Sequence, residues 1–195
     1  LDAVAEKFGD ILPKMQWVNF GGGHHITRPG YAVETLEHCI ARAQNAWGVT
    51  VYLEPGEACA LNAGYLLTRV LDVVQNGGTT VAILDASAAC HMPDVIEMPY
   101  RPPLLFAGDA GQKPCTVRLA GPTCLAGDVI GDYSFDAVPR AGDLLVFGDM
   151  AIYTTCKNNT FNGMPLPAIC VRDEAGNVRE LVKFGYRDFK ARLGR

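Results

Sequence analysis

The chain has 195 residues, of which 49% are hydrophobic and 19% charged, and its formal net charge is −4. This composition is that of an ordinary globular protein, and a weakly acidic chain without a basic run excludes nucleic acid as an expected partner. No apolar run approaches the ~20 residues that a membrane-spanning helix needs, so we expect no membrane partner either.

The first part of the chain predicts alternating helices and strands. Residues 1–12 have a helical pattern, and the apolar run 15–20 predicts a buried strand. Residues 31–47 predict an amphipathic helix, and the apolar run 49–53 predicts a second buried strand. Residues 60–74 fit another helix, ended by the glycines that follow. The order strand, helix, strand is typical of an α/β domain.

After residue 78 the pattern changes to short strand-like runs separated by turn signals. The runs are 79–84, 116–120, 144–147, 168–172 and 178–184. Because no strong helical pattern separates them, they predict an all-β domain. We therefore expect two domains, 1–78 and 79–195, with the last segment, near 185–195, packing back on the first.

Two further observations bear on the origin of the chain. It begins in a predicted helix, and its first predicted strand has no earlier strand to pair with. We therefore expect a C-terminal portion of a longer protein, or one piece of a cleaved one. The seven cysteines are odd in number, scattered, and without a C-x-x-C pair, which favours the reduced thiols of a cytoplasmic protein over zinc or disulfides.

A loop follows each predicted strand of the first domain. Gly21-Gly22-Gly23 comes after the first strand, and its uncovered backbone suits an anion such as phosphate, although it also fits a flexible turn. Glu54, with Gly56 close behind, ends the second strand and also fits an ordinary turn. A carboxylate at the end of a buried strand needs a partner, and a protonated ring nitrogen of a cofactor would be one.

Three other residues follow predicted strands, and the sequence alone does not assign a role to any of them. His24 and His25 follow the glycine loop and fit exposed loop positions; no third ligand completes a metal set, so no metal is predicted. Asp85 follows the apolar run 79–84. It fits either a turn or a carboxylate that meets a substrate cation.

The second domain adds a cysteine, an aspartate and a tyrosine. Cys124 lies in a loop, with Asp128 four residues later, and fits either a small buried side chain or a proton-donating thiol. Tyr153 follows the run 144–147. It fits either core packing with a satisfied hydroxyl or a phenol that donates to phosphate.

Taken in order, these motifs span most of the chain and are more specific together than apart. They are Gly21-Gly22-Gly23, Glu54-Pro55-Gly56, Asp85, Gly121-Pro122-Thr123-Cys124, Asp128 and the segment from Asp149-Met150 through Tyr153-Thr154 to Phe161-Asn162-Gly163. The set resembles the fold-type III decarboxylases that use pyridoxal 5′-phosphate (PLP), a group that includes ornithine, diaminopimelate and carboxynorspermidine (carboxyspermidine) decarboxylases. The likeness is closest to the last of these.

The resemblance implies a fold and a set of roles. The fold would be the last part of a PLP-binding α/β barrel of the alanine racemase type, followed by a C-terminal β domain. The enzyme would be a homodimer with composite sites, in which Cys124 acts in the partner subunit's site and protonates the substrate carbon after CO₂ leaves. The remaining roles would fall on residues that match the family motifs. These are Gly21, Gly22, Gly23, Gly56 and Tyr153 for phosphate, Glu54 for the pyridinium nitrogen, and Asp85, Asp128 and His25 for the amines of a polyamine carboxylate.

The sequence also departs from the family pattern. Glu57 stands where ornithine decarboxylases usually have an arginine, and Leu125 stands where ornithine and diaminopimelate decarboxylases usually have a carboxylate. Both departures weaken those two alternatives. No lysine occupies the place of the covalent anchor of the cofactor, so this stretch is not expected to catalyse alone. A non-catalytic homologue that binds a partner, or a phosphate-binding module without chemistry, also stays open.

Overall fold

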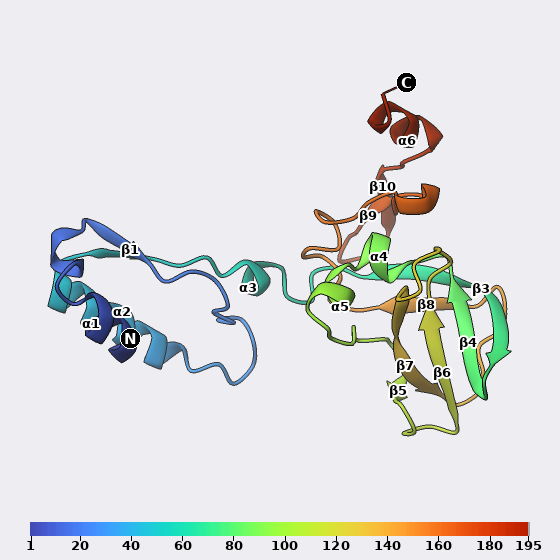
Figure 1. Cartoon of the computed structure of the whole chain (residues 1–195), viewed down its shortest axis with the longest axis horizontal. Coiled ribbons are helices and arrows are strands. Elements are labelled where there is room, and N and C mark those ends of the chain that lie inside the picture. The colour runs from blue at the N-terminus through green and yellow to red at the C-terminus, as the bar shows by residue number, and fades with distance from the viewer. Residues whose placement is uncertain (195) are drawn as a thin grey trace. The chain divides into compact units, whose positions relative to one another are not determined.

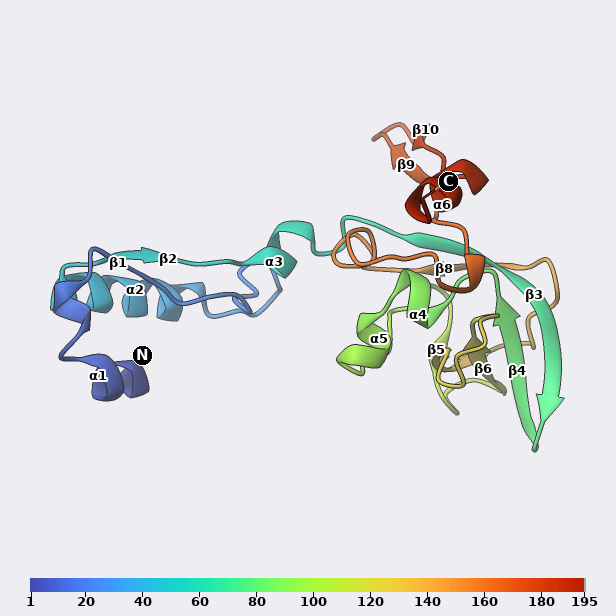
Figure 2. The same ribbon diagram turned by 45° about the horizontal axis from the view of Figure 1, so that its top comes forward.

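The computed structural model describes residues 1–194 and divides the chain into two compact units, Leu1–Leu61 and a second that begins at Asn62 (Figures 1 and 2). The division falls before the expected one at residue 78. None of the described helices has the length and apolar character that a membrane crossing requires.

The first unit is a strand–helix–strand unit with short helices around it. Strands β1 (Trp17–Asn19) and β2 (Thr50–Tyr52) pair in parallel, and α2 (Val33–Trp47) connects them. The short elements are α1 (Asp2–Phe8), η1 (Leu12–Lys14) and α3 (Gly56–Ala60). The two strands lie where the sequence predicts them.

The strands of the first unit are not buried, contrary to the prediction. Trp17 is 59% exposed and Tyr52 is 54% exposed, and their rings pack edge to face with centroids 6.0 Å apart. The physical reason is that a sheet of two strands hides little of either face, even with the connecting helix nearby. Ala43 on α2 and Val49 before β2 are the deeply buried apolar residues here, with Leu12 and Ala58.

The second unit is built on a six-stranded sheet. Its strands are β3 (Leu66–Asn76), β4 (Thr79–Leu84), β5 (Gly108–Asp109), β6 (Cys115–Ala120), β7 (Val129–Phe135) and β8 (Leu144–Phe147). They lie in the order β5-β7-β6-β4-β3-β8. All neighbours are antiparallel except β4 and β6, which run parallel.

Strand β3 corrects the helix predicted for residues 60–74. Leu66, Thr68 and Val70 are buried while the residues between them are exposed, which is the two-residue period of a strand. Gly77 and Gly78 have φ of 56° and 80° and form the tight turn between β3 and β4, in place of the predicted helix cap.

Short helices and a hairpin complete the second unit. Helices α4 (Ala88–His91) and α5 (Asp94–Glu97) follow β4, and the turn η2 (Phe161–Gly163) precedes the antiparallel hairpin of β9 (Ile169–Arg172) and β10 (Val178–Val182). The last helix, α6 (Tyr186–Arg192), belongs to this unit. Packing of this segment on the first domain stays a prediction.

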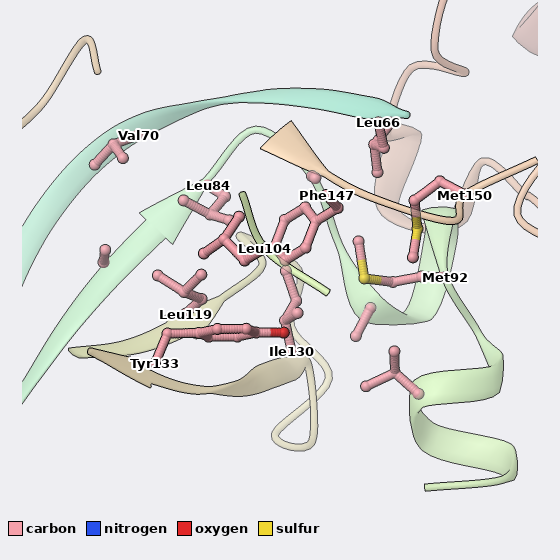
Figure 3. Packing of buried hydrophobic residues seen from close by; sticks show 14 of the residues in the cluster. Leu66, Val70, Leu84, Met92, Leu104, Leu119, Ile130, Tyr133, Phe147 and Met150 are labelled. Carbon is pink, nitrogen blue, oxygen red and sulfur yellow. The ribbon is translucent and has the colours of Figure 1, made fainter. Parts of the chain in front are cut away.

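The core of the second unit lies between the sheet and α4. Tyr133 and Phe147 are fully buried and meet edge to face, with ring centroids 6.1 Å apart (Figure 3). The Tyr133 hydroxyl donates to the Pro102 carbonyl at 2.7 Å, so the one polar atom of that ring is satisfied. Burial raises the pKa of Tyr133 well above its ordinary value.

Candidate active site

The glycine loop and the Glu54 loop lie together because β1 and β2 are parallel neighbours. Their carboxyl ends meet at one edge, where the Phe20 N–H donates to the Tyr52 carbonyl at 3.0 Å and the Glu54 N–H donates to the Gly21 carbonyl at 2.9 Å. A Cβ on Gly22 would lie 3.0 Å from the Glu54 carbonyl oxygen, so the close approach of the two loops favours glycine there.

Asn19, at the end of β1, joins the two loops through its side chain. Its Nδ2 donates to Oε1 of Glu54 at 2.6 Å, and its Oδ1 accepts from the Gly21 N–H at 2.8 Å. The Glu54 carboxylate is therefore held in a fixed orientation. The sequence motifs assigned no role to Asn19. The one feature that could have indicated this role is its position just before the glycines, since its side-chain amide can both donate and accept hydrogen bonds.

The glycine loop leaves room for an anion. Gly21 and Gly23 have φ of 74° and 79°, and a Cβ built on either meets no atom within 4 Å. Among the described residues none accepts a hydrogen bond from the N–H of Gly22 or Gly23. By contrast, the N–H groups of Gly21 and Gly56 already donate, to Asn19 and to the Glu54 carbonyl. The loop therefore fits a phosphate through Gly22 and Gly23 in particular.

Glu57 contacts two basic side chains beside the same loop. Its Oε1 lies 2.6 Å from a guanidinium nitrogen of Arg28 and 3.1 Å from Nδ1 of His25. Glu57 therefore orients His25. In ornithine decarboxylases an arginine usually stands at the position of Glu57. The neighbouring His24 has its Nδ1 3.4 Å from the Tyr31 hydroxyl, and its Nε2 is buried without a partner among the described residues.

The second unit brings another pair of strand ends together. Parallel strands β4 and β6 are in register, with Ile83 opposite Ala120, so the segments after them leave the sheet at the same edge. Asp85 follows β4, and the loop that carries Cys124 follows β6. The parallel pairing thus explains why residues far apart in the sequence meet at one edge.

Asp85 is exposed and oriented by the adjacent strand β3. Its Oδ1 accepts from the Thr68 hydroxyl at 2.5 Å and from the Arg69 N–H at 2.8 Å. No described residue donates to its second oxygen, Oδ2. The structure therefore leaves one carboxylate oxygen of Asp85 open to a ligand cation.

Asp128 was expected to face the substrate, but in the structure its carboxylate is buried. It is only 3% exposed, and its carboxylate accepts from the Ser87 hydroxyl at 2.9 Å, the Thr123 hydroxyl at 2.6 Å and the Ala89 N–H at 3.3 Å. A Cβ on Gly121 would lie 2.2 Å from Oδ2, so glycine is needed there to admit the carboxylate. Because internal donors occupy Asp128, we assign it to holding the cysteine loop and not to meeting a substrate amine.

Cys124 itself is exposed, so the buried alternative does not apply. Its N–H donates to Oδ1 of Asn162 at 2.9 Å. Cys90, by contrast, is a buried thiol whose pKa is raised by its burial. Of the two cysteines at this edge of the sheet, only Cys124 is accessible to a reacting molecule.

Tyr153 is 51% exposed, which excludes the core-packing alternative. The Lys157 ammonium lies 5.5 Å from the centroid of its ring and forms ion pairs with Asp94 and Glu97. No described residue accepts from or donates to the Tyr153 hydroxyl. The phenol is therefore open to a ligand, as the phosphate role requires.

His91, the last residue of α4, is a buried histidine. The sequence motifs did not single it out. Its Nδ1 accepts from the Ser87 N–H at 3.1 Å, and its Nε2 donates to the Pro165 carbonyl at 3.0 Å. Both contacts together require a neutral ring. Burial lowers the pKa of His91, which agrees with that state.

The fold is that of the fold-type III PLP-dependent decarboxylases. Residues 7–151 match the sequence model of the family described as "Pyridoxal-dependent decarboxylase, C-terminal sheet domain", and the chain belongs to this family. The fit of the site to PLP rests on the open glycine loop and the oriented Glu54 carboxylate.

Known relatives agree with this identification. A carboxynorspermidine/carboxyspermidine decarboxylase of Campylobacter jejuni is 42% identical over 98% of this chain and 53% of its own length. A carboxyaminopropylagmatine decarboxylase of Synechocystis is 40% identical over 100% of this chain and 50% of its own length. The chain thus spans about half the length of the curated relatives it matches.

Solved structures show the same fold. The crystal structure of the carboxynorspermidine decarboxylase of Campylobacter jejuni in complex with norspermidine superposes with a TM-score of 0.85 at 42% identity, over 98% of this chain and 55% of that one. A diaminopimelate decarboxylase superposes with a TM-score of 0.73 at 21% identity, over 98% of this chain and 52% of that one. The second likeness, at its lower identity, shows the fold alone.

Proposed function

We propose that the full-length protein is a PLP-dependent decarboxylase that acts on carboxynorspermidine or carboxyspermidine in polyamine biosynthesis. The observation that carries the proposal is the Cys124 loop, in which Leu125 follows the cysteine. The 42% identity to the Campylobacter jejuni enzyme over nearly the whole chain supports it. Ornithine and diaminopimelate remain alternatives, weakened by Leu125.

The residues of the first unit would bind the cofactor. Gly22 and Gly23 offer free N–H groups to its phosphate. The phosphate role of Tyr153, whose side chain is exposed, rests on the family resemblance. Glu54, oriented by Asn19, holds a proton on the ring nitrogen through its carboxylate. When bound, PLP supplies a conjugated pyridinium that takes up the electron pair left by departing CO₂.

The second unit would contribute the proton and the substrate contacts. The Cys124 thiol delivers a proton to the carbon that has lost CO₂. The open oxygen of Asp85 would meet a distal amine of the substrate. For His25 of the first unit, which Glu57 orients, the proposed role in substrate binding rests on the family resemblance. We propose a homodimer in which Cys124 serves the partner's site, and a reducing cytoplasmic setting, because all seven cysteines are free thiols.

A second candidate substrate comes from a specific likeness. The 40% identity to the Synechocystis enzyme favours carboxyaminopropylagmatine, whose distal end is a guanidinium and not an ammonium. Asp85 suits either cation, since a carboxylate pairs with both.

One experiment separates an enzyme from a non-catalytic homologue. The full-length protein is incubated with PLP and carboxynorspermidine, and bound cofactor absorbance and CO₂ release are recorded together. We expect both signals. Cofactor absorbance without CO₂ from any of the candidate amino acids would contradict the decarboxylase proposal, and binding of PLP no tighter than inorganic phosphate would favour a phosphate-binding module.

A further inference from the structure

Asn162 lies in the turn η2 in a left-handed backbone conformation, with φ of 56° and ψ of 18°. Asparagine tolerates this conformation better than most residues, which alone would explain its presence. Its side chain does more than shape the turn, because Oδ1 accepts the N–H of Cys124, a residue 38 positions earlier, at 2.9 Å. Among the described residues, this is the one hydrogen bond that reaches the main chain of Cys124.

The segment that offers Asn162 is itself anchored. The side-chain amide of Asn159 donates to the Ala89 carbonyl at 2.8 Å, and the Asn159 N–H donates to the Cys90 carbonyl at 2.9 Å. These bonds attach the segment to α4. The segment that carries Asn162 is therefore held in place by hydrogen bonds to α4.

The cysteine loop is held from its other side by Asp128. The buried carboxylate accepts from the hydroxyl of Thr123 at 2.6 Å and from its N–H at 3.3 Å. Thr123 is thus fixed by Asp128, and the next residue, Cys124, is fixed by Asn162. Two independent side chains hold two consecutive residues, which leaves the thiol little freedom to change its position.

We propose that Asn162 is a positioning residue for Cys124, acting through the Cys124 N–H to set where the thiol delivers its proton. The inference rests on the proposed function, in which Cys124 is the proton donor. Proton transfer needs hydrogen-bond reach between donor and acceptor, and a displacement of ~1 Å is enough to cost about 100-fold in rate. The sequence showed Asn162-Gly163 only as a turn signal.

The test uses substitutions that separate the hydrogen bond from the turn. Glycine adopts the left-handed conformation freely, so Asn162→Gly keeps the turn and removes the acceptor. Asn162→Asp keeps an acceptor at the same place. Asn62→Gly is the matched control, because Asn62 also has a positive φ, 57°, and its side chain bonds to no other described residue. Cys124→Ala shows whether the thiol matters at all.

Two readouts are taken on the full-length, PLP-loaded enzyme. The first is steady-state kcat and KM with carboxynorspermidine, and the second is the rate of iodoacetamide alkylation at Cys124, followed by peptide mass spectrometry with Cys59 and Cys170 as internal references. For Asn162→Gly we expect kcat to fall about 10- to 100-fold with KM changed less than about 2-fold, and the alkylation rate at Cys124 alone to change. Asn162→Asp is expected to keep kcat within about 3-fold, and Asn62→Gly to match wild type.

Each contrary outcome identifies what has failed. Wild-type kcat and wild-type alkylation in Asn162→Gly, with activity lost in Cys124→Ala, would overturn the positioning role alone. Wild-type turnover in Cys124→Ala would overturn the role proposed for Cys124, and the inference with it. An equal loss in Asn62→Gly would show that added chain flexibility, and not the lost acceptor, is responsible.

Discussion

The amide of Asn19 donates to Oε1 of Glu54 at 2.6 Å and at the same time accepts the Gly21 N–H at 2.8 Å. One side chain thus fixes both the orientation of the carboxylate and the path of the glycine loop. Nδ2 of Asn19 donates to Oε1, and no described residue donates to the other carboxylate oxygen of Glu54. The geometry of the proposed cofactor site would therefore depend on Asn19, a residue with no proposed contact to the phosphate.

Asn19→Asp tests this dependence. The change replaces the donor with a second carboxylate beside Glu54, and like charges at hydrogen-bond distance repel. We expect affinity for PLP and kcat each to fall about 10-fold or more, equivalent to ~1.4 kcal/mol per 10-fold, as measured by absorbance titration and steady-state kinetics of the full-length enzyme. Asn45→Asp, an exposed position on α2 with the same change of charge, is the control and should be neutral. Equal behaviour of the two variants would remove Asn19 from this role.

Glu54→Gln tests the carboxylate itself. The amide keeps the shape of Glu54 but cannot hold a proton on the ring nitrogen by charge. Cofactor binding should persist. The activation free energy should rise by several kcal/mol, and each ~1.4 kcal/mol lowers kcat by a factor of ten. The measurement is kcat at saturating PLP with the bound cofactor quantified in the same sample. Wild-type turnover would exclude Glu54 from the proposed role.

Subunit complementation tests the composite site. Full-length Cys124→Ala and Glu54→Gln proteins are each expected to be impaired, and a mixed dimer would contain one site with both residues intact. Mixing the two should therefore raise activity above the sum of the separate proteins. Self-mixing of each variant is the control. Proven subunit exchange without any recovered activity would contradict shared sites.

Replacement of Asp128 tests its structural assignment. Asp128→Ala leaves the Ser87 and Thr123 hydroxyls without their buried acceptor, which we expect to lower the free energy of unfolding by about 2–4 kcal/mol. Asp132 is the matched control, since it is half-buried and pairs with Arg118 across the sheet at 2.8 Å; loss of that pair in Asp132→Ala should cost less than about 1 kcal/mol. Urea denaturation of both variants gives the comparison. An equal, small cost for the two would contradict the assignment.

His91 predicts a pH dependence of stability. Burial lowers its pKa in the native state, so below the ordinary value of ~6.5 the unfolded chain takes up a proton that the native chain does not. Stability from this residue is therefore fully present above pH ~6.5 and is lost as the pH falls below it. The measurement is Tm at pH 7.5 and pH 5.5 for wild type and His91→Gln. The variant should lose less Tm on acidification than wild type does, and an identical loss would refute the prediction.

The sequence predicted most elements of the first unit and the β character of the second, but it misassigned β3. Leu66 and Val70 are four residues apart, a spacing that places two residues on one face of a helix and also on one face of a strand. Thr68 is buried between them, and this shows the two-residue period of a strand. Strand β7 was not predicted at all, because Gly131 and Asp132 interrupt its apolar pattern. Short apolar runs do not distinguish these possibilities by periodicity alone.

For the candidate site, the sequence motifs singled out the loops but not the contacts that hold them. Asn162 meets Cys124 across 38 residues, and Ser87 meets Asp128 across 41. The Ser87–Asp128 contact follows from the parallel pairing of β4 and β6. The Asn162–Cys124 contact depends in addition on Asn159, which bonds the segment of Asn162 to α4. No local pattern encodes such a pairing, so Asp128 was expected at the substrate and Asn162 was expected only in a turn.

The proposed preference for a long polyamine carboxylate can be measured directly in a competition assay. The relative kcat/KM of the full-length enzyme is measured for carboxynorspermidine, carboxyspermidine, carboxyaminopropylagmatine, diaminopimelate and ornithine, since this ratio reports differential binding of the transition state. Leu125 offers no contact to the amine of a short substrate, which would then bury an unpaired ammonium. We predict that kcat/KM for carboxynorspermidine or carboxyspermidine exceeds that for ornithine and diaminopimelate by about 100-fold or more. Comparable values for ornithine and carboxynorspermidine would contradict it.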